Sequence, residues 1–162
     1  MSHGTAESHG ASEPPGETET GPLSETLWQL FRALQHAGDP AATATTTTAT
    51  GERVLRGEAG REQDVTRVRF ALRVAGGHIL EARYRAFGCP YTLAACEWLA
   101  RQLQGRELAV PGAAGLAQAV GAVGGPLEWA RTLQIPAARL GRLLVIEDAL
   151  RAAFDPPVTK GA

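Results

Sequence analysis

The chain of 162 residues has no asparagine, no serine after Ser24, a single lysine at Lys160 and only two cysteines, Cys89 and Cys96. A serine hydrolase or a Schiff-base enzyme needs a nucleophile that the body of this chain does not offer, so the sequence argues against both classes. No glycine-rich phosphate-binding motif is present either. We therefore expect a protein that is not an enzyme, whose chemistry depends on cysteine, carboxylates and arginine.

Long hydrophobic runs are also absent, so we expect no membrane-spanning segment and no membrane partner. Two cysteines are too few for a disulfide framework, which favours a reducing cytoplasm. Residues 1–23 consist mainly of Gly, Ser, Glu, Thr and Pro and predict a disordered acidic tail. Residues 24–155 are expected to form one domain, followed by a flexible C-terminal tail over 156–162.

The net charge of −1 is unevenly distributed along the chain. Five acids precede the first base, Arg32, which leaves 12 acids against 16 bases in the rest of the chain. This modest positive excess is too small to predict nucleic-acid binding, and we expect none.

Hydrophobic periodicity predicts an α+β domain. Residues 65–74 and 79–87 each alternate apolar and polar side chains across a Gly-Gly turn, which indicates an antiparallel hairpin. The apolar faces expected of these two strands consist of Val68, Phe70, Leu72 and Val74, and of Leu80, Ala82, Tyr84 and Ala86. Residues 41–50 are β-prone and fit an edge strand and a loop equally well.

Helices account for most of the remaining pattern. They are expected from Ser24, as N-cap, to near Gly38, over 91–104, over 126–133 and over 137–154, with a weak glycine-broken one over 107–122. The predicted fold is a small antiparallel sheet of two to three strands covered on one face by helices. It has an N-terminal helix and a helical C-terminal half.

Cys89 lies where the second strand runs into the helix over 91–104. Gly88 permits a sharp turn there, and Pro90 suits the first helical position. Cys89 is then at a helix N-terminus, where the dipole and free N–H groups stabilise a thiolate. Such a thiolate is a metal ligand, a sulfur acceptor or a nucleophile; the alternative is an inert thiol at a strand end. Cys96, about 10 Å farther along the helix, is expected to be an apolar core residue.

The hairpin brings a carboxylate to the same end of the sheet. Facing apolar residues pair Val74 with His78 or Leu80, which places Asp64 within one residue of the position opposite Cys89. His78 lies at the turn, on the order of 30 Å from Cys89, and is expected to be a solvated turn residue.

Four segments then resemble a known family in order and spacing. They are Asp64-Val65 at the start of a strand, Phe87-Gly-Cys89 between strand and helix, Gly105-Arg-Glu-Leu after it, and Ile135-Pro-Ala-Ala-Arg-Leu140 before Glu147-Asp-Ala-Leu-Arg-Ala-Ala153. Over roughly residues 24–154 the chain resembles the IscU/NifU iron–sulfur cluster assembly scaffolds. The resemblance implies a protein that accepts sulfur from a cysteine desulfurase, assembles a [2Fe–2S] cluster on three cysteines with help from an aspartate, and transfers it to recipient proteins.

Only part of the family's ligand set is kept. Asp64 and Cys89 match it, whereas Glu62 stands in place of the first cysteine and Gly141-Arg142 in place of a His-Cys pair. The implied site has Cys89 as the sulfur- or cluster-binding residue and Asp64 and Glu62 as further metal ligands. Because oxygen donors suit Fe²⁺ or Zn²⁺ better than a sulfide-bridged cluster, we expect at most one weakly held divalent ion per chain, or a labile cluster in a dimer.

Two arginine features have alternative interpretations. Arg142 is either a solvated helix residue or a counter-ion for Glu62 or Asp64. The arginines on the outer face of the hairpin are either a solvated face or the docking surface of an acidic partner; they are Arg67, Arg69, Arg73, Arg83 and Arg85.

Two functional classes follow. The first is a divergent scaffold, monomeric or weakly dimeric, whose partners are a cysteine desulfurase and iron–sulfur recipient proteins. The second is a homologue that binds no cluster and acts as an adaptor or regulatory module for a desulfurase or another assembly partner.

Overall fold

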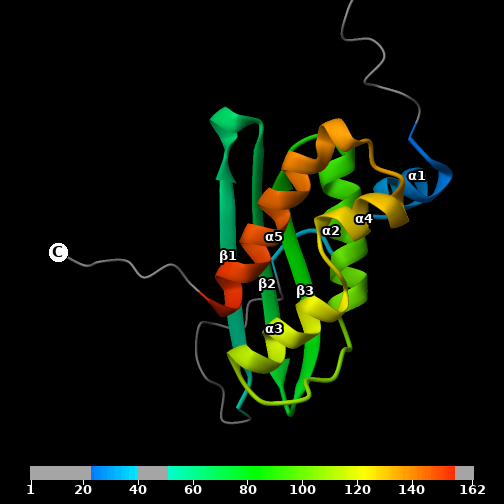
Figure 1. The fold of residues 1–162 in the computed structure, drawn as a ribbon. Helices are drawn as coiled ribbons and strands as arrows, with labels where there is room; N and C mark the ends of the chain where they lie inside the picture. The colour runs from blue at the N-terminus through cyan, green and yellow to red at the C-terminus, as the bar shows by residue number, and fades with distance from the viewer. Residues whose placement is uncertain (1–22, 40–50, 156–162) are drawn as a thin grey trace, which may run out of the picture.

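The computed structural model describes residues 23–39 and 51–155 (Figure 1). The predicted tails and the segment 41–50 lie almost wholly outside the described residues, so the predictions made for them stay open. The elements, in chain order, are α1 (Glu25–Arg32), β1 (Arg53–Arg61), the 3-10 turn η1 (Glu62–Asp64), β2 (Thr66–Ala75), β3 (His78–Phe87), α2 (Pro90–Leu103), α3 (Ala113–Ala122), α4 (Pro126–Leu133), the 3-10 turn η2 (Ala137–Arg139) and α5 (Leu140–Phe154).

The sheet is antiparallel with the order β1-β2-β3, which confirms the predicted fold class. The sequence pattern did not predict β1, because Gly57 and several charged residues interrupt its alternation. Gly57 is needed where it lies: α5 crosses β1 so closely that a Cβ there would be 2.1 Å from the carbonyl oxygen of Ala149. The glycine that obscures the strand in the sequence therefore permits the close packing of α5 on the sheet.

A β-bulge divides the β2–β3 ladder. The ladder runs from Arg67 opposite Phe87 to Arg73 opposite Glu81 in a single register. Continued by one residue, this register would pair Val74 with Leu80. The bulge shifts it, and Val74 pairs with Ile79 instead. Neither predicted partner of Val74 was therefore right. One extra residue reverses the alternation of side chains. The prediction that Leu80 belongs to the apolar face was wrong for this reason: Ile79 is fully buried and Leu80 is 40% exposed.

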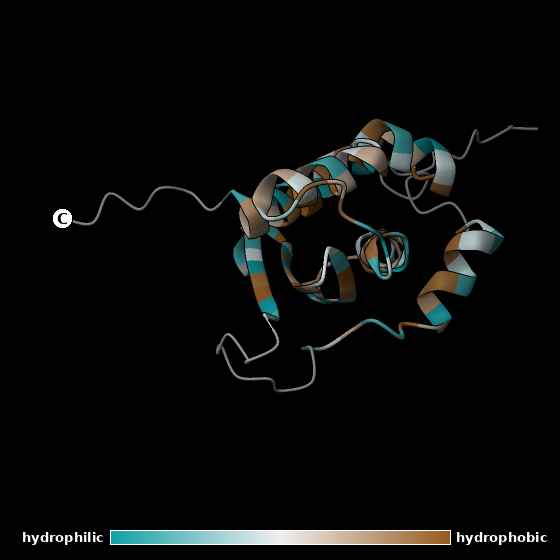
Figure 2. Ribbon diagram, turned by 90° about the horizontal axis from the view of Figure 1, so that it is seen from below, coloured by the Kyte–Doolittle hydropathy of each residue, from teal (hydrophilic) through white to brown (hydrophobic). Residues whose placement is uncertain are grey.

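The helices cover one face of the sheet, and α2 lies at the centre of the fold. Seen from below, α2 is viewed end-on, with the sheet and the other helices around it (Figure 2). Nine of its 14 residues are buried, which explains why its hydrophobic pattern extends around most of the helix. Among the described residues, no helix is long and apolar enough to cross a bilayer.

The helix predictions hold closely except at the end of the first helix, which was expected near Gly38 and lies at Arg32. The side chain of Ser24 accepts a hydrogen bond from the N–H of Leu27 and so caps α1, as expected. The helix expected over 137–154 begins as the 3-10 turn η2 and continues as α5, and the weak segment over 107–122 is helical only from Ala113.

Candidate functional site

Cys89 is the N-cap residue of α2 and lies two residues after the end of β3. Its side chain is half-buried and reduced, and its Sγ lies 3.5 Å from the Thr92 hydroxyl. The β region backbone at Cys89 (φ −76°, ψ 167°), followed by Pro90 at the first helical position, directs the chain from strand into helix. The predicted strand–cysteine–helix junction is therefore present.

The surroundings of Cys89 stabilise its thiolate. Burial raises the pKa of this thiol, but the Thr92 hydroxyl, the N–H groups of Thr92 and Tyr91 and the charge of Arg142 outweigh it, so that the net pKa is lower than that of an ordinary cysteine. The sulfur makes no capping hydrogen bond of standard geometry, so the two amides act mainly through their dipoles at the start of the helix.

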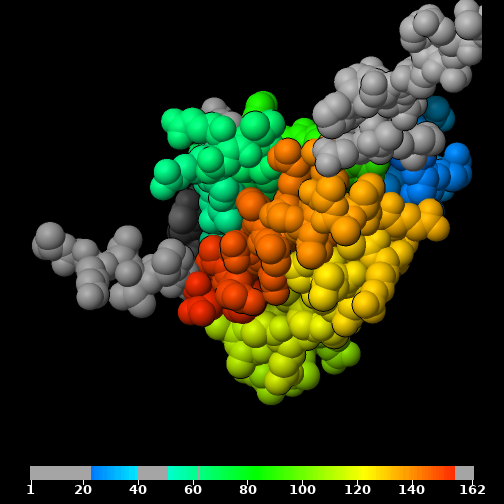
Figure 3. Space-filling model, turned by 45° about the horizontal axis from the view of Figure 1, so that its top comes forward, coloured from blue at the N-terminus to red at the C-terminus, as the bar shows by residue number. Residues whose placement is uncertain are grey.

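Two other segments meet at the end of the molecule that holds Cys89. The turn between β1 and β2 contains Asp64, and the first turn of α5 contains Gly141 and Arg142. Figure 3, with the top of the molecule turned forward, shows the β1–β2 turn and the orange start of α5 next to each other at the surface. The positions that the family resemblance assigned to metal ligands thus come from neighbouring element ends.

Asp64 is exposed and belongs to η1. The β2–β3 ladder ends at Arg67 opposite Phe87, so Asp64 lies three residues beyond the last pair and is not a cross-strand partner of Cys89. Only the backbone of Glu62, in the same turn, is described. The assignment of Asp64 and Glu62 as metal ligands remains a prediction.

Arg142 holds the β1–β2 turn rather than a carboxylate. Its Nη1 donates to the carbonyl oxygen of Val65 at 3.1 Å and, in a short contact, to the Thr66 hydroxyl. Among the described side chains Arg142 forms no ion pair, so the interpretation of Arg142 as a counter-ion of Asp64 was wrong. The reason is geometric: the turn offers its backbone carbonyl and a buried hydroxyl to the guanidinium. The same interpretation for Glu62 stays a prediction, because the Glu62 side chain is not described.

Val65 has an unusual backbone conformation beside this contact. Its φ is +60°, a left-handed value that β-branched residues rarely adopt, and its side chain is 55% exposed. Such a conformation costs about 1–3 kcal/mol and persists only where the surroundings enforce it. The hydrogen bond from Arg142 to the Val65 carbonyl is one contact that does so.

A metal-binding constellation is not apparent in the described part of the chain. No three side chains among His, Cys, Asp and Glu lie together there as an ion would require. The positions that the resemblance in the sequence assigns to a third cysteine and a histidine carry Arg142 and Gly141, which offer no ligand atom. The described donors therefore do not fit a cluster held by one chain alone.

Two other predictions from the sequence are confirmed. Cys96 is fully buried in the core, and burial together with the neighbouring Glu97 raises the pKa of its thiol far above the ordinary range. His78 is exposed at the β2–β3 turn, with Nδ1 3.0 Å from the Gly76 carbonyl oxygen. Neither residue contributes to a site with Cys89.

A buried carboxylate network was not predicted. Glu97 is fully buried in α2 and accepts hydrogen bonds from the backbone N–H of His36 at 2.8 Å, from Arg101 Nε at 2.8 Å and from the Tyr84 hydroxyl at 3.3 Å. Residues 36–38 also pair with the edge of β3 at Tyr84. The network joins the segment after α1 to α2 and the sheet. An acid in a largely apolar stretch of helix, next to Cys96, was the available signal.

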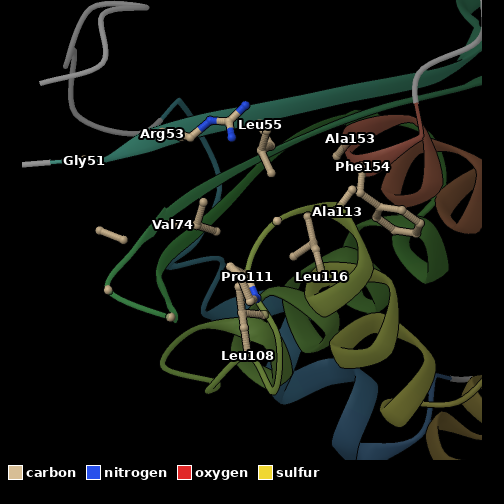
Figure 4. A pocket seen from close by; sticks show the side chains of 14 residues that line it. Gly51, Arg53, Leu55, Val74, Leu108, Pro111, Ala113, Leu116, Ala153 and Phe154 are labelled. Carbon is tan, nitrogen blue, oxygen red and sulfur yellow. The ribbon is translucent and has the colours of Figure 1, made fainter.

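A cavity of about 430 Å³ lies at the opposite end of the molecule (Figure 4). It is formed by the start of β1, the β2–β3 turn, the segment before α3 and the end of α5. Leu55, Val74, Leu116 and Phe154 are among its walls, and Arg53 supplies its only charged side chain among the described residues. Without a nucleophile or an acid–base group, it is not a candidate for the chemistry of Cys89.

Comparison with known proteins agrees with this geometry. Residues 31–150 match the family of NifU-like N terminal domains. The bifunctional protein NifU/MnmA of Rubrobacter xylanophilus is 39% identical over 102 residues, which cover 61% of this chain but only 19% of that relative. This chain therefore matches one part, about a fifth, of a longer protein.

Two solved structures share the fold at low sequence identity. One is a protein from Fervidobacterium islandicum AW-1 assigned as an iron–sulfur cluster assembly scaffold of the SUF system (TM-score 0.56, 15% identity, 82% of this chain and 96% of that one). The other is the N-terminal part of a nitrogen-fixing NifU-like protein from Brucella abortus (TM-score 0.51, 13% identity, 85% of this chain and 94% of that one).

Sheet, helices and the cysteine at the β3–α2 junction define an α+β domain of the iron–sulfur scaffold class. Since the family match covers residues 31–150, the chain belongs to the NifU-like N-terminal domain family. The resemblance inferred from four short segments is thereby confirmed at the level of family and fold.

Proposed function

We propose that this protein is a divergent member of the scaffold family that accepts sulfur at Cys89 for delivery to recipient proteins. The observation that supports this proposal is the environment of Cys89: its half-buried thiolate is stabilised by the start of α2, by Thr92 and by Arg142. A thiolate in such a position is the reactive form of cysteine in sulfur exchange.

The proposed step is a thiolate exchange with a persulfide on a cysteine desulfurase. The Cys89 thiolate attacks the outer sulfur of the persulfide, and a new S–S bond forms at Cys89. The S–S bond of the donor breaks, and its electron pair leaves with the donor's cysteine as a thiolate. The transferred sulfur keeps its own charge or proton, so no further oxidant or reductant is needed. The protein acts as a carrier and not as an enzyme in this step.

Iron would be cargo in this proposal, not a resident cofactor. Cys89 supplies one thiolate, and Asp64 and Glu62 supply harder oxygen donors, so one chain is suited at most to a weakly held Fe²⁺ or Zn²⁺. A [2Fe–2S] cluster would need thiolates from a second chain. The partners in this scheme are a cysteine desulfurase and apo-proteins that receive sulfur or cluster, in a reducing cytoplasm where the thiol persists.

The alternative proposal is an adaptor that binds an assembly partner and carries no sulfur. One observation favours it: Arg142, at the family's third cysteine position, is committed to Val65 and Thr66 and offers nothing to a metal.

The two proposals differ in what a desulfurase leaves on the chain. We would incubate the protein with a cognate cysteine desulfurase and free cysteine and analyse its peptides by mass spectrometry without reductant. The carrier proposal predicts one extra sulfur on Cys89, abolished by Cys89→Ser and retained in the control Cys96→Ala. A chain that binds the desulfurase but never gains sulfur at Cys89 supports the adaptor.

A further inference from the structure

Arg142 occupies an electrostatically unfavourable place. It lies in the first turn of α5, where the helix dipole is positive and a cation is destabilising. It is nevertheless held in place by two hydrogen bonds from Nη1, to the Val65 carbonyl and to the hydroxyl of Thr66, which is only 3% exposed. The two hydrogen bonds thus hold a positive charge at a helix start, where the helix dipole disfavours it.

None of the described side chains neutralises the charge of Arg142. A guanidinium has five N–H donors, and the two contacts use Nη1 alone. Among the side chains that the structure describes, which do not include that of Glu62, no carboxylate pairs with Arg142, and neither acceptor that it binds carries a charge. Nε and Nη2 therefore keep their donors for a ligand or for water. This contrasts with Arg69 and Arg73, which both form ion pairs.

This free charge acts on the sulfur of Cys89. Arg142 binds Thr66, one residue beyond the last β2–β3 pair of Arg67 and Phe87, and Cys89 follows Phe87 by two residues at the same end of the sheet. In keeping with this placement, the charge of Arg142 is one of the causes that lower the pKa of the Cys89 thiol. A persulfide ionises more readily than a thiol, so the exchange brings an anionic donor to an anionic acceptor and leaves two anions as products. A fixed cation beside the sulfur reduces the repulsion on both sides of the reaction.

We propose that Arg142 is a specificity residue that makes Cys89 selective for anionic sulfur donors, the charged persulfide in particular. This inference rests on the proposed sulfur-accepting function. A metal-binding interpretation of this position gives Arg142 no role. Here the guanidinium itself supplies the positive charge beside the sulfur that a bound metal would otherwise supply. Arg142 positions and attracts the donor and takes no part in bond making.

The charge role can be separated from the structural contact with the turn by two alkylating reagents. Iodoacetate is anionic and iodoacetamide is neutral, and both react with the same thiolate. The ratio of their rates at Cys89 is therefore independent of the thiolate fraction and of general changes in exposure. We would measure both rates at neutral pH and low salt on the full chain, with peptide mass spectrometry to assign the label to Cys89.

Three variants decide the outcome. In Arg142→Gln the ratio of iodoacetate to iodoacetamide rates should fall by about three- to fivefold, since a unit charge near the sulfur is lost. Arg142→Lys should keep more than half of the wild-type ratio. The control Arg106→Gln removes the same charge at the far end of β3, where the Arg106 carbonyl accepts from the N–H of Ile79, and should leave the ratio unchanged. Added salt should lower the wild-type ratio towards that of Arg142→Gln.

A ratio in Arg142→Gln equal to that of the wild type overturns the inference, even if both rates change together, because equal changes reflect the loss of the turn contact alone. A lysine variant that falls as far as the glutamine variant also overturns it, since the charge is then not the cause. Neither result touches the sulfur-accepting function, which is tested with a desulfurase. If no persulfide ever forms on Cys89 while the ratio behaves as expected, the function fails and the charge effect stands.

Discussion

His36 contacts both carboxylate oxygens of Glu97, with its backbone N–H 2.8 Å from Oε1 and its Nδ1 2.7 Å from Oε2. Glu97 belongs to the central helix, whereas His36 follows α1, 61 residues earlier in the chain. The pair therefore attaches the N-terminal segment to the core through a buried charge.

Replacing Glu97 with glutamine should lower the free energy of unfolding by about 2–3 kcal/mol, because charged hydrogen bonds from His36 and Arg101 are weakened in a buried site. Urea unfolding of the two proteins measures the difference. The control is Glu147→Gln, which removes an i,i+4 pair with Arg151 at the surface and should cost no more than about 0.5 kcal/mol. Equal effects of the two substitutions would contradict a structural role for the network.

The same carboxylate predicts a dependence of stability on pH. Burial raises the pKa of Glu97, but hydrogen bonds from His36 and Arg101 outweigh it and hold the pKa below its ordinary value. A lowered pKa in the folded state contributes stability that is fully present above the unfolded-state pKa, about 4.3, and is lost as the pH falls through the folded-state value. The acid side of the stability curve should be flatter in Glu97→Gln, as measured by unfolding between about pH 5 and pH 3.

Gly57 should not tolerate a side chain. Its Cβ would lie 2.1 Å from the Ala149 oxygen and 2.3 Å from the Ala153 nitrogen, both backbone atoms of α5, so Gly57→Ala must move the helix. We expect a loss of about 3 kcal/mol. Gly121→Ala is the matched control, since that helical glycine has no atom within 4 Å of its Cβ position, and it should stabilise α3 by about 0.5–1 kcal/mol. Similar melting temperatures for both variants would refute this packing.

Val65→Gly should stabilise the protein despite the loss of a side chain. The left-handed φ of +60° is strained for valine and free of strain for glycine, and more than half of the side chain is already exposed. We expect a gain of about 1 kcal/mol after allowing for the greater entropy of unfolded glycine. A destabilised variant in urea titrations would mean that the turn is not strained at this residue.

The two thiols should differ in reactivity. Cys89 is half-buried at a helix start with a lowered pKa, whereas Cys96 is fully buried with a raised one. Iodoacetamide at neutral pH should therefore label Cys89 long before Cys96 in the native protein. Peptide mass spectrometry over time gives both rates, and labelling of Cys96 first would contradict the helix-start geometry.

Restoring thiolates tests whether the family's ligand positions converge. The double variant Glu62→Cys with Arg142→Cys should hold more cluster than the wild type after anaerobic reconstitution with iron and sulfide. Visible absorption measures the cluster occupancy. The control is the same double variant with Cys89→Ser added. If the double variant binds no more than the wild type, these positions do not meet in space as they do in scaffolds with three thiolates.

The sequence was informative where a pattern is local. The cap at Ser24, the alternation in β2 and the Gly88-Cys89-Pro90 junction each depend on neighbouring residues, and the structure confirms them. The bulge that buries Ile79 could not be seen, because both phases of alternation in that strand present an apolar residue at its start. β1 was missed because its defining residue, Gly57, is explained only by a helix some 90 residues farther along the chain.

The site was predictable only in part, because some of its contacts join residues far apart in the sequence. Cys89 is identified by its own strand and helix, but the partners of Arg142 lie 76 and 77 residues away, and charge alone suggested a carboxylate. The contacts between His36 and Glu97 likewise depend on tertiary packing, which no period in the sequence reveals.

The placement of Cys89, Asp64, Gly141 and Arg142 at the ends of elements has an evolutionary consequence. None of these positions belongs to the buried core, and a Cβ at Gly141 would meet nothing within 4 Å. Side chains there can be exchanged without disturbing the packing of α2 and α5 on the sheet. Substitutions at these four positions should therefore leave the domain folded, so that the chemistry of this end can change over evolution while the packing of α2 and α5 is kept.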